Sequence, residues 1–241
     1  MRCLIIAAGR GSRLAHRFPF KPLAPIAGTP LIERIMGLAA GQGVREFVIV
    51  GGYRCRELER FIHEAAARLR IVATVIENAG WQRENGHSVL AARESLPGDF
   101  VLLMADHLFA GALLGVALRA TLNPGQAALV VDFRIKGHPH VDLDDVTKVR
   151  TCNGRILDIG KRLPTYNAFD TGIFRCTPGL FSALEESMHR GDGSLSGGMR
   201  LLAHSGDALA LDGGRRFWID VDDERAFALA EDHFAGGSRH S

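Results

Sequence analysis

Apolar runs and helical periodicity alternate through the first half of the chain. Short apolar runs that end at glycine or polar residues predict buried β-strands, whereas apolar residues three or four positions apart predict helices with one buried face. This alternation predicts a parallel sheet whose strands are joined by right-handed helical crossovers. The strands are expected at 3–7, 47–50, 71–76 and 100–104, and the helices at 31–40, 56–69 and 88–95.

The second half has a different pattern, with strand-like runs and short connections. Between two of these runs Asn153-Gly154 is a strong signal for a hairpin turn. Strands are expected at 127–133, 146–151, 155–159, 172–176, 208–211 and 216–219, helices at 178–189 and 224–234, and a disordered tail at 236–241. We therefore expect one α/β domain over 1–235, with a Rossmann-like, mostly parallel sheet flanked by helices and a small β-rich part in its second half.

Composition narrows the class of protein. The 241 residues are 46% hydrophobic and 23% charged, and the net charge of +2 is spread along the chain, which favours a small anionic substrate over nucleic acid. Cys3 and Cys176 lie in apolar runs without metal-ligand spacing, so free thiols in a reducing cytosol are expected. The stretch 108–118 is too short to span a bilayer and no signal peptide is visible, so we expect a cytoplasmic protein without membrane insertion.

A glycine-rich loop follows the first predicted strand. Glycines let a backbone turn tightly and bring its amide groups close to an anion. A dinucleotide-binding fold requires a third glycine where Leu14 stands, and an acid where Gly51 and Gly52 follow the second strand. A P-loop motif is absent from the sequence. The loop reads Ala7-Ala8-Gly9-Arg10-Gly11-Ser12-Arg13-Leu14, and Lys21-Pro22-Leu23 follows it.

Aspartates follow two distant predicted strands. Asp106 stands at the carboxyl end of 100–104, where open α/β sheets bind ligands, and Asp220 and Asp222 share one side of a late strand. Carboxylate oxygens are the ligands that Mg²⁺ prefers, although Asp106 and Asp222 could instead be helix caps. The acidic run 142–145 and the segment 138–140 are expected to be solvated loops, without a role in a site.

The loop, the arginine and the Lys-Pro-Leu element together resemble the signature of the sugar-phosphate nucleotidyltransferases. The resemblance implies that Arg13 contacts the triphosphate of a bound nucleotide and Lys21 its α-phosphate. It also implies that Mg²⁺ is bound by Asp106 and Asp220, with Asp222 as support. The loop residues that would surround the nucleotide are Ala7, Ala8, Gly9, Gly11 and Ser12.

Further segments resemble one branch, the CTP:inositol-1-phosphate cytidylyltransferases. These are 85–90, 104–107, 159–161, 170–172 and 218–222. The resemblance implies that 1–125 binds the nucleotide, with Asn85, Gly86 and Ser88 at its base, and that 126–235 binds the acceptor. In that second half Lys161 would contact the acceptor phosphate, and Asp170, Thr171 and Gly172 would line its pocket. His87 replaces the tyrosine of the branch, and 162–166 matches nothing in it.

The implied reaction is transfer of CMP from CTP to a small phosphorylated alcohol, inositol 1-phosphate in this branch, with release of pyrophosphate. Phosphocholine, a sugar 1-phosphate or a phosphonate are alternative acceptors. An inactive nucleotide-binding regulatory module and a glycosyltransferase are alternatives of other classes. A separate membrane CDP-alcohol phosphotransferase is an expected downstream partner, and the oligomeric state stays open.

Overall fold

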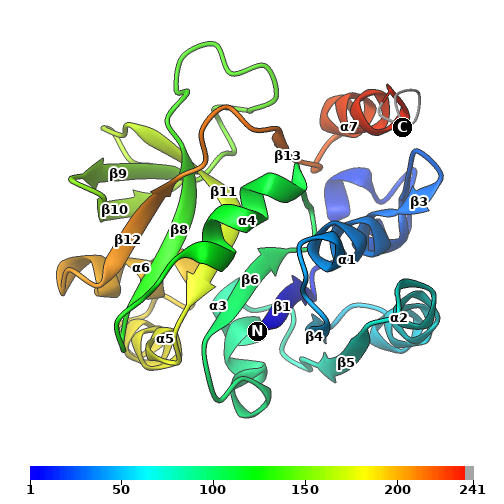
Figure 1. The fold of residues 1–241 in the computed structure, drawn as a ribbon, viewed down its shortest axis with the longest axis horizontal. Helices are drawn as coiled ribbons and strands as arrows, with labels where there is room; N and C mark the ends of the chain where they lie inside the picture. Colours follow the sequence, from blue (N-terminus) through cyan, green and yellow to red (C-terminus); the bar gives the residue numbers. More distant parts are fainter. Residues whose placement is uncertain (237–241) are drawn as a thin grey trace.

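A computed structural model describes residues 1–236. The predicted tail 236–241 lies outside this described part except for Gly236, which is wrongly assigned to it because it is the last residue of a helix. One nine-stranded mixed sheet runs through the molecule (Figure 1) in the order β5-β4-β1-β6-β11-β8-β12-β10-β9. The predicted α/β class is confirmed. The division of the chain into a nucleotide half and an acceptor half stays a prediction.

The first-half strands are all parallel to one another, as the alternating pattern predicts. They are β1 (Arg2–Ala7), β4 (Glu46–Gly51), β5 (Val72–Glu77) and β6 (Phe100–Met104). β1 lies between β4 and β6, with Leu4 opposite both Val48 and Leu102. The carboxyl ends of these strands therefore meet at one edge of the sheet, where the glycine loop leaves β1.

The second-half strands pair mainly in antiparallel fashion and curve back on themselves. They are β8 (Ala127–Asp132), β9 (Lys148–Cys152), β10 (Arg155–Gly160), β11 (Ala168–Cys176) and β12 (Ala208–Asp212). β11 joins the two halves because it pairs antiparallel with β6 on one side and with β8 on the other. β9 pairs with β10 and again with β11, which closes this part of the sheet. Asn153 and Gly154 have φ angles of 48° and 73°, so the predicted hairpin turn is confirmed.

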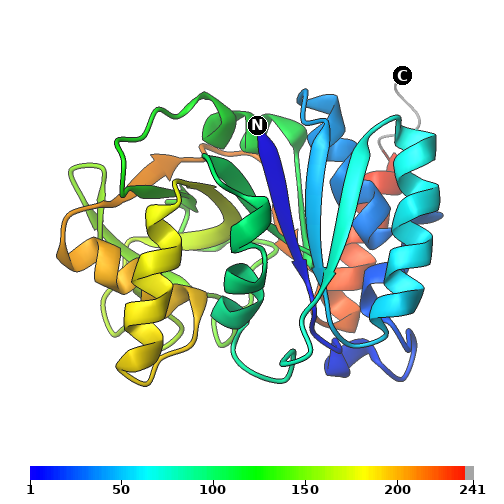
Figure 2. The same ribbon diagram turned by 90° about the horizontal axis from the view of Figure 1, so that it is seen from below.

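Helices cover both faces of the sheet (Figure 2) and bury two separate cores. On one face lie α1 (Leu31–Gly41), α2 (Cys55–Leu69), α4 (Gly111–Arg119) and α7 (Glu224–Gly236). On the other face lie α3 (Asn85–Ala91), α5 (Gly179–His189) and α6 (Leu195–His204). Alternate residues of β1 serve the two cores, Ile5 the first and Leu4 the second, as the two-residue period of a strand requires.

Helix α6 is not predicted by the sequence pattern, because its first turn contains Gly197 and Gly198, which disfavour a helix. Tertiary packing explains them. A Cβ on Gly197 would lie 2.4 Å from Ser187 Oγ, and one on Gly198 would lie 2.7 Å from Leu184 Cδ2. The close contact between α5 and α6 therefore needs glycine at both positions.

The apolar stretch 108–118 contains the short strand β7 (His107–Phe109) and most of α4. The predicted strand 216–219 is β13 (Trp218–Asp220), which lies outside the main sheet and pairs antiparallel with β7. In this register Asp220 lies opposite His107, so the two predicted metal-binding segments are neighbours.

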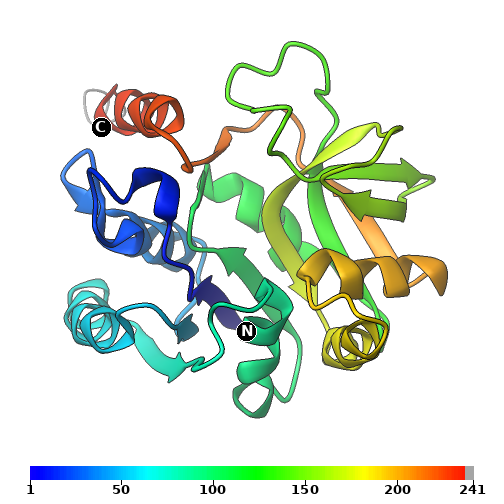
Figure 3. The ribbon, with the colours of Figure 1, turned by 180° about the vertical axis from the view of Figure 1, so that it is seen from behind.

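Helix α7 lies beside the segment that follows β1 (Figure 3). There Phe227 packs on Phe18 with ring centroids 4.8 Å apart. Short elements complete the fold: 3₁₀ turns at Ser12–Leu14, Lys21–Leu23 and Arg93–Ser95, and the small pair β2 (Pro25–Ile26) and β3 (Thr29–Pro30). The predicted helix 88–95 thus begins earlier and breaks before its last turn. Within residues 1–236, no helix combines the length and the hydrophobicity needed to cross a membrane.

Candidate active site

A cavity opens at the carboxyl ends of β1 and β6, bounded on its other side by β10, β11 and the segment that leads into α7. Eight of the residues that the sequence predicts for the site line it: Arg13, Asn85, Asp106, Lys161, Asp170, Gly172, Asp220 and Asp222. They come from both halves of the chain. The fold therefore brings together groups that are up to about 200 residues apart in sequence.

The glycine loop packs directly on Lys21. Gly11 has a φ of 65°, and a Cβ at this position would lie 2.6 Å from Lys21 Cβ. Ala7 and Ala8 are buried, and the Ala8 carbonyl accepts a hydrogen bond from the amide of Tyr53. Gly9 and Ser12 complete the loop beside Arg13. The loop thus holds a lysine whose side chain is only 7% exposed at the edge of the cavity.

The cations of the loop pair with carboxylates from the other half of the chain. Lys21 Nζ lies 3.4 Å from Asp106 Oδ2 and forms a second ion pair with Asp222. Arg13 also pairs with Asp222, and its Nη1 lies 2.7 Å from Asp145 Oδ2. Burial lowers the pKa of Lys21, but the nearby charges of these aspartates outweigh it and raise that pKa above its ordinary value.

His107 connects two of the predicted metal ligands, a role that the sequence reasoning did not assign to it. Its Nδ1 donates a hydrogen bond to Asp106 Oδ1 at 2.9 Å and lies 4.0 Å from Asp220 Oδ1. Burial lowers the pKa of His107, but the charge of Asp220 and the bond to Asp106 outweigh it and raise this pKa to about 9. Although burial opposes it, the charge of Lys21 holds the pKa of Asp106 well below its usual range.

The carboxylates fit a divalent cation. Ligand atoms of Asp145, Asp220 and Asp222 all lie within 4.8 Å of one another, and so do those of Asp106, His107 and Asp220. Asp220 belongs to both groups. Its Oδ1 is buried and has no hydrogen-bond partner among the described residues. Burial, together with the charges of Asp106 and Asp222, raises the pKa of Asp220 to about 7 although His107 opposes the rise, and a bound cation would relieve this crowding of negative charge.

The expectation that the acidic run 142–145 has no role in the site is wrong for Asp145, which lines the cavity. Its carboxylate lies between two predicted substrate-binding cations, 2.7 Å from Arg13 Nη1 and 2.5 Å from Lys161 Nζ. The run leads into β9, and the curvature of the second half brings it over the cavity. Sequence position alone places these aspartates in a polar connection, so no local signal separates Asp145 from its exposed neighbour Asp144.

Of the three residues predicted to contact the base, one lines the cavity and the other two are packed in the interior. Asn85 lines the cavity, and its Oδ1 accepts a hydrogen bond from the amide of Leu195. Gly86 packs against the connection between α5 and α6, because a Cβ there would lie 2.4 Å from the carbonyl oxygen of Gly193. Ser88 is buried, and its Oγ accepts a hydrogen bond from Asn78 Nδ2. His87 lies near Gly193 rather than on the cavity wall.

The predicted acceptor residues lie at an irregular part of β11, where its register with β8 shifts. Asp170 and Gly172 line the cavity, and burial raises the pKa of Asp170 to about 6 against the bond from the Gly172 amide. Gly172, with a φ of 76°, leaves space for the His107 ring, which a Cβ would approach to 2.6 Å. Thr171 does not line the pocket as predicted. Strand alternation turns its side chain inward, where Oγ1 donates to the Val130 carbonyl.

Two further expectations change with the structure. Segment 138–140 is exposed only at Pro139, because the side chain of His138 is 1% exposed and its Nε2 bonds with Asp132 Oδ2 at 3.0 Å. The alternative of a helix cap at Asp222 is also wrong. Asp223 accepts the hydrogen bond from the amide of Ala226 at the start of α7, which leaves Asp222 free to face the cavity.

Comparison with known proteins places the chain among nucleotidyltransferases. Residues 3–156 match the family model described as "MobA-like NTP transferase domain". The chain is 34% identical over 242 residues to "Bifunctional IPC transferase and DIPP synthase" of Rubrobacter xylanophilus, covering 96% of this chain and 51% of that protein. The protein of the same description in Thermococcus kodakarensis is 32% identical over 223 residues, covering 92% and 48%. The chain thus spans about half the length of the curated relatives it matches.

A solved structure described as the inositol-1-phosphate CTP transferase from T. maritima superposes with a TM-score of 0.83. It is 25% identical and covers 95% of this chain and 94% of its own. A UDP-glucose pyrophosphorylase in complex with UDP-glucose has a TM-score of 0.75 at 18% identity, a likeness of fold alone.

Proposed function

The chain belongs to the family of MobA-like NTP transferase domains, and on that premise we propose that it transfers CMP from CTP to inositol 1-phosphate and releases pyrophosphate. One observation carries the proposal: Arg13 and Lys161 line one cavity together with Asp106, Asp220 and Asp222, and the nearly buried Lys21 pairs with two of these aspartates. Two phosphorylated substrates repel each other, so a site that joins them needs cations on both sides and ligands for a metal between them.

In the proposed reaction, an oxygen of the acceptor phosphate attacks the α-phosphorus of CTP in line with the leaving pyrophosphate. The new P–O bond forms as the bond between the α-phosphorus and the bridging oxygen breaks, and the electron pair leaves with pyrophosphate. The attacking oxygen is already an anion, so no residue needs to remove a proton from it. Catalysis then consists of positioning and charge neutralisation.

Arg13 and Lys21 are the proposed contacts of the triphosphate. Both come from the segment between β1 and β2, and both are paired with Asp222 in the structure. Nucleotide binding would exchange these pairs for contacts with phosphate oxygens, and Asp222 would then be free to bind a metal. Asp106, Asp220 and Asp222 are the proposed ligands of Mg²⁺, whose charge would offset that of the phosphates.

Lys161 is the proposed contact of the acceptor phosphate, and Asp145 connects it with Arg13 across the cavity. The carboxylate of Asp170 lines the same region and can accept hydrogen bonds from hydroxyl groups of a polyol. Phosphocholine would need a cage of aromatic rings around its quaternary ammonium group. The rings nearest to the acceptor segments, those of Tyr166, Phe169 and Trp218, do not form such a cage. Phe169 is fully buried in the core and Tyr166 packs on it at 5.7 Å, whereas Trp218 lines the cavity wall.

The nucleotide and acceptor are identified by pyrophosphate release in a matrix of substrates. CTP, ATP, GTP and UTP are each combined with inositol 1-phosphate, phosphocholine, glucose 1-phosphate and 2-aminoethylphosphonate. We expect the highest kcat/KM for CTP with inositol 1-phosphate. A different best nucleotide would contradict the proposed cytidylyl transfer, and a different best acceptor would contradict only the choice of inositol 1-phosphate.

The variant Lys161→Met tests which of the two substrates Lys161 contacts. It should raise the KM for the acceptor and leave the KM for CTP within about twofold, because Lys161 is proposed to contact only the acceptor. We also propose a cytosolic location, which the free thiols of the buried Cys3 and Cys176 support.

A further inference from the structure

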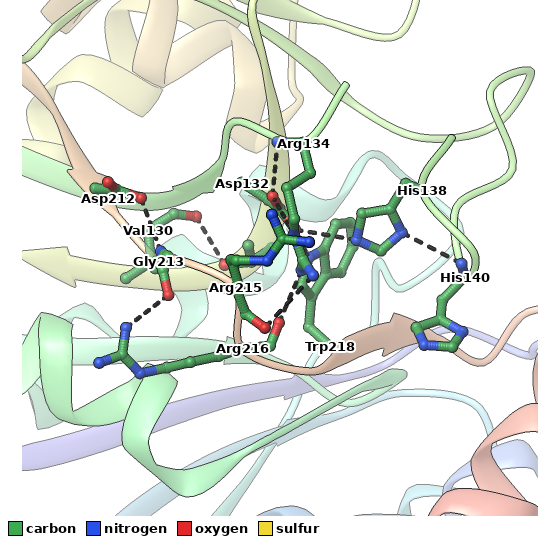
Figure 4. Close-up of polar contacts among 12 residues, drawn as sticks. Val130, Asp132, Arg134, His138, His140, Asp212, Gly213, Arg215, Arg216 and Trp218 are labelled. Atoms are coloured by element: carbon green, nitrogen blue, oxygen red, sulfur yellow. Dashed lines mark hydrogen bonds and ion pairs between the residues drawn. The ribbon is translucent and has the colours of Figure 1, made fainter. Parts of the chain in front are cut away.

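A buried carboxylate lies behind the wall of the active site, at the end of β8 (Figure 4). Asp132 is 1% exposed and accepts hydrogen bonds from three side chains that belong to two separate segments. Trp218 Nε1 donates at 2.7 Å, His138 Nε2 lies at 3.0 Å, and the guanidinium of Arg134 contacts both carboxylate oxygens. A full set of charged and neutral partners around one buried carboxylate defines its position closely.

One of these partners, Trp218, belongs to the strand that carries the proposed metal ligand Asp220. Trp218 is the first residue of β13 and is 2% exposed, and Asp220 is the last residue of that strand. The indole lies almost parallel to the ring of His107, with an interplanar angle of 4° and centroids 6.3 Å apart. Since His107 contacts Asp106 and lies opposite Asp220, one ring separates the indole from both carboxylates.

The same carboxylate also reaches the connection that precedes β13. Asp132 orients Arg134, and Arg134 donates to the carbonyl oxygens of Arg215 at 3.4 Å and Arg216 at 2.9 Å. The start of this connection is attached to β8 through the bond from the Gly213 amide to the Val131 carbonyl. The 213–218 segment is thus attached to the end of β8 at several successive points. On its other side β13 pairs with β7, and the Phe217 carbonyl accepts a hydrogen bond from the Ala110 amide.

We propose that Asp132 is a positioning residue, which acts through Trp218 to hold β13 where Asp220 and Asp222 can bind the metal. Asp132 does not line the cavity and touches neither substrate. Asp132 fixes the direction of the indole. The position of the indole in turn fixes the position of the backbone from Trp218 to Asp222. The inference rests on the proposed metal site, and it adds a residue from β8 that no motif of the sequence identifies.

Mn²⁺ binding to the purified protein, measured by the loss of the free-ion EPR signal, tests the proposal without any turnover. Titrations are done well below the melting temperature of every variant, and each melting temperature is recorded. Asp132→Asn removes the charge that orients Arg134 and His138, and Trp218→Phe removes the indole donor but keeps an aromatic ring. We expect about 10- to 100-fold weaker Mn²⁺ binding for Asp132→Asn, as for residues that orient metal ligands elsewhere.

Trp218→Phe should show a smaller loss in the same direction, and the double variant should bind almost as well as Asp132→Asn alone, because both changes remove one shared contact. The matched control is Asp99→Asn, which breaks the ion pair with the buried Arg175 at the opposite end of the sheet. It should lower the melting temperature and leave Mn²⁺ affinity unchanged. Asp132→Glu, which restores the charge, should recover part of the lost affinity.

The outcomes separate the possible failures. If Asp132→Asn and Trp218→Phe lower the melting temperature but bind Mn²⁺ as tightly as Asp99→Asn does, Asp132 is merely structural and the positioning role is overturned. If Asp220→Asn also binds Mn²⁺ as the unchanged protein does, the metal site itself is wrong. Steady-state kinetics of Asp132→Asn should agree with the binding data. We expect a lower kcat at saturating CTP and a far smaller change in the KM for CTP.

Discussion

Gly11 and Lys21 are in such close contact that no side chain fits between them. A Cβ at Gly11 would lie 2.6 Å from Lys21 Cβ and 2.8 Å from Lys21 Cδ. The glycine loop therefore has a role beyond bringing amide groups to an anion. It forms the surface against which the nearly buried lysine extends toward Asp106 and Asp222.

Gly11→Ala should therefore move Lys21 and reduce kcat/KM by about a hundredfold, the effect of a displacement of roughly 1 Å in a reacting group. Gly28→Ala is the matched control. Gly28 also has a left-handed φ, of 77°, but a Cβ there has nothing within 4 Å. Both variants lose about 1–2 kcal/mol from the left-handed backbone, and Gly11→Ala has in addition the clash with Lys21, so its melting temperature should fall further. Equal activity of the two variants would disprove the role of the contact.

Asp106→Asn and Asp220→Asn should each reduce turnover by more than about a hundredfold. The loss of a metal ligand should reduce turnover more than the loss of a residue that only orients a ligand, which typically costs about 10- to 100-fold. The melting temperature of Asp220→Asn should fall little, because burial already disfavours the charge of this carboxylate. That of Asp106→Asn should fall, because the change breaks the ion pairs with Lys21 and His107. Asp212→Asn serves as a control for a carboxylate outside the cavity, where Asp212 accepts a bond from the Gly214 amide. Turnover near that of the unchanged protein in either site variant would remove that residue from the metal site.

Asp145→Asn should raise the KM for both substrates, because this one carboxylate pairs with Arg13 and with Lys161. Both cations are half exposed, so each contact is worth a few tenths to about 1 kcal/mol, which corresponds to a KM change of about two- to fivefold. Initial-rate kinetics with each substrate varied in turn measure the effect. Asp144→Asn, one position earlier and exposed, should leave both KM values unchanged. Lower KM values in both Asp145→Asn and Asp144→Asn would show instead that these carboxylates act by general repulsion of the substrate phosphates.

Asp132 should make the stability of the fold depend on pH in acid. Burial raises its pKa, but the bonds from His138, Arg134 and Trp218 outweigh it and lower that pKa well below the ordinary value. An aspartate whose native pKa is depressed stabilises the fold above its unfolded pKa of about 3.9 and loses this effect as pH falls toward the native pKa.

Asp132→Asn should therefore cost about 3 kcal/mol at neutral pH, the usual loss when a buried ion pair is broken. The difference from the unchanged protein should shrink as pH falls from about 5 toward 3. Urea unfolding across this range measures it, with Asp144→Asn as the variant that removes a surface carboxylate. A difference that stays constant or grows in acid would show that Asp132 is not ionised in the native state.

The sequence by itself determined the alternating first half of the sheet and the hairpin at Asn153-Gly154, and its resemblance to a family pointed to the loop cations and to most cavity aspartates. Each of these features depends on local pattern. Alternation of apolar residues selects the strands, a left-handed turn selects asparagine and glycine, and the carboxyl end of a parallel strand places Asp106 at the edge of the sheet.

Only the tertiary structure decided the roles of residues whose partners lie far away in the chain. Asp145 and Asp144 have the same local context, and the closure of β9 onto β11 alone brings the first of them between Arg13 and Lys161. Thr171 adjoins Asp170 and Gly172, yet strand alternation turns it into the core. Helix α6 forms despite its glycines because α5 requires close contact, and His138 is buried because Asp132 accepts its bond. Such roles depend on distances that no local pattern encodes.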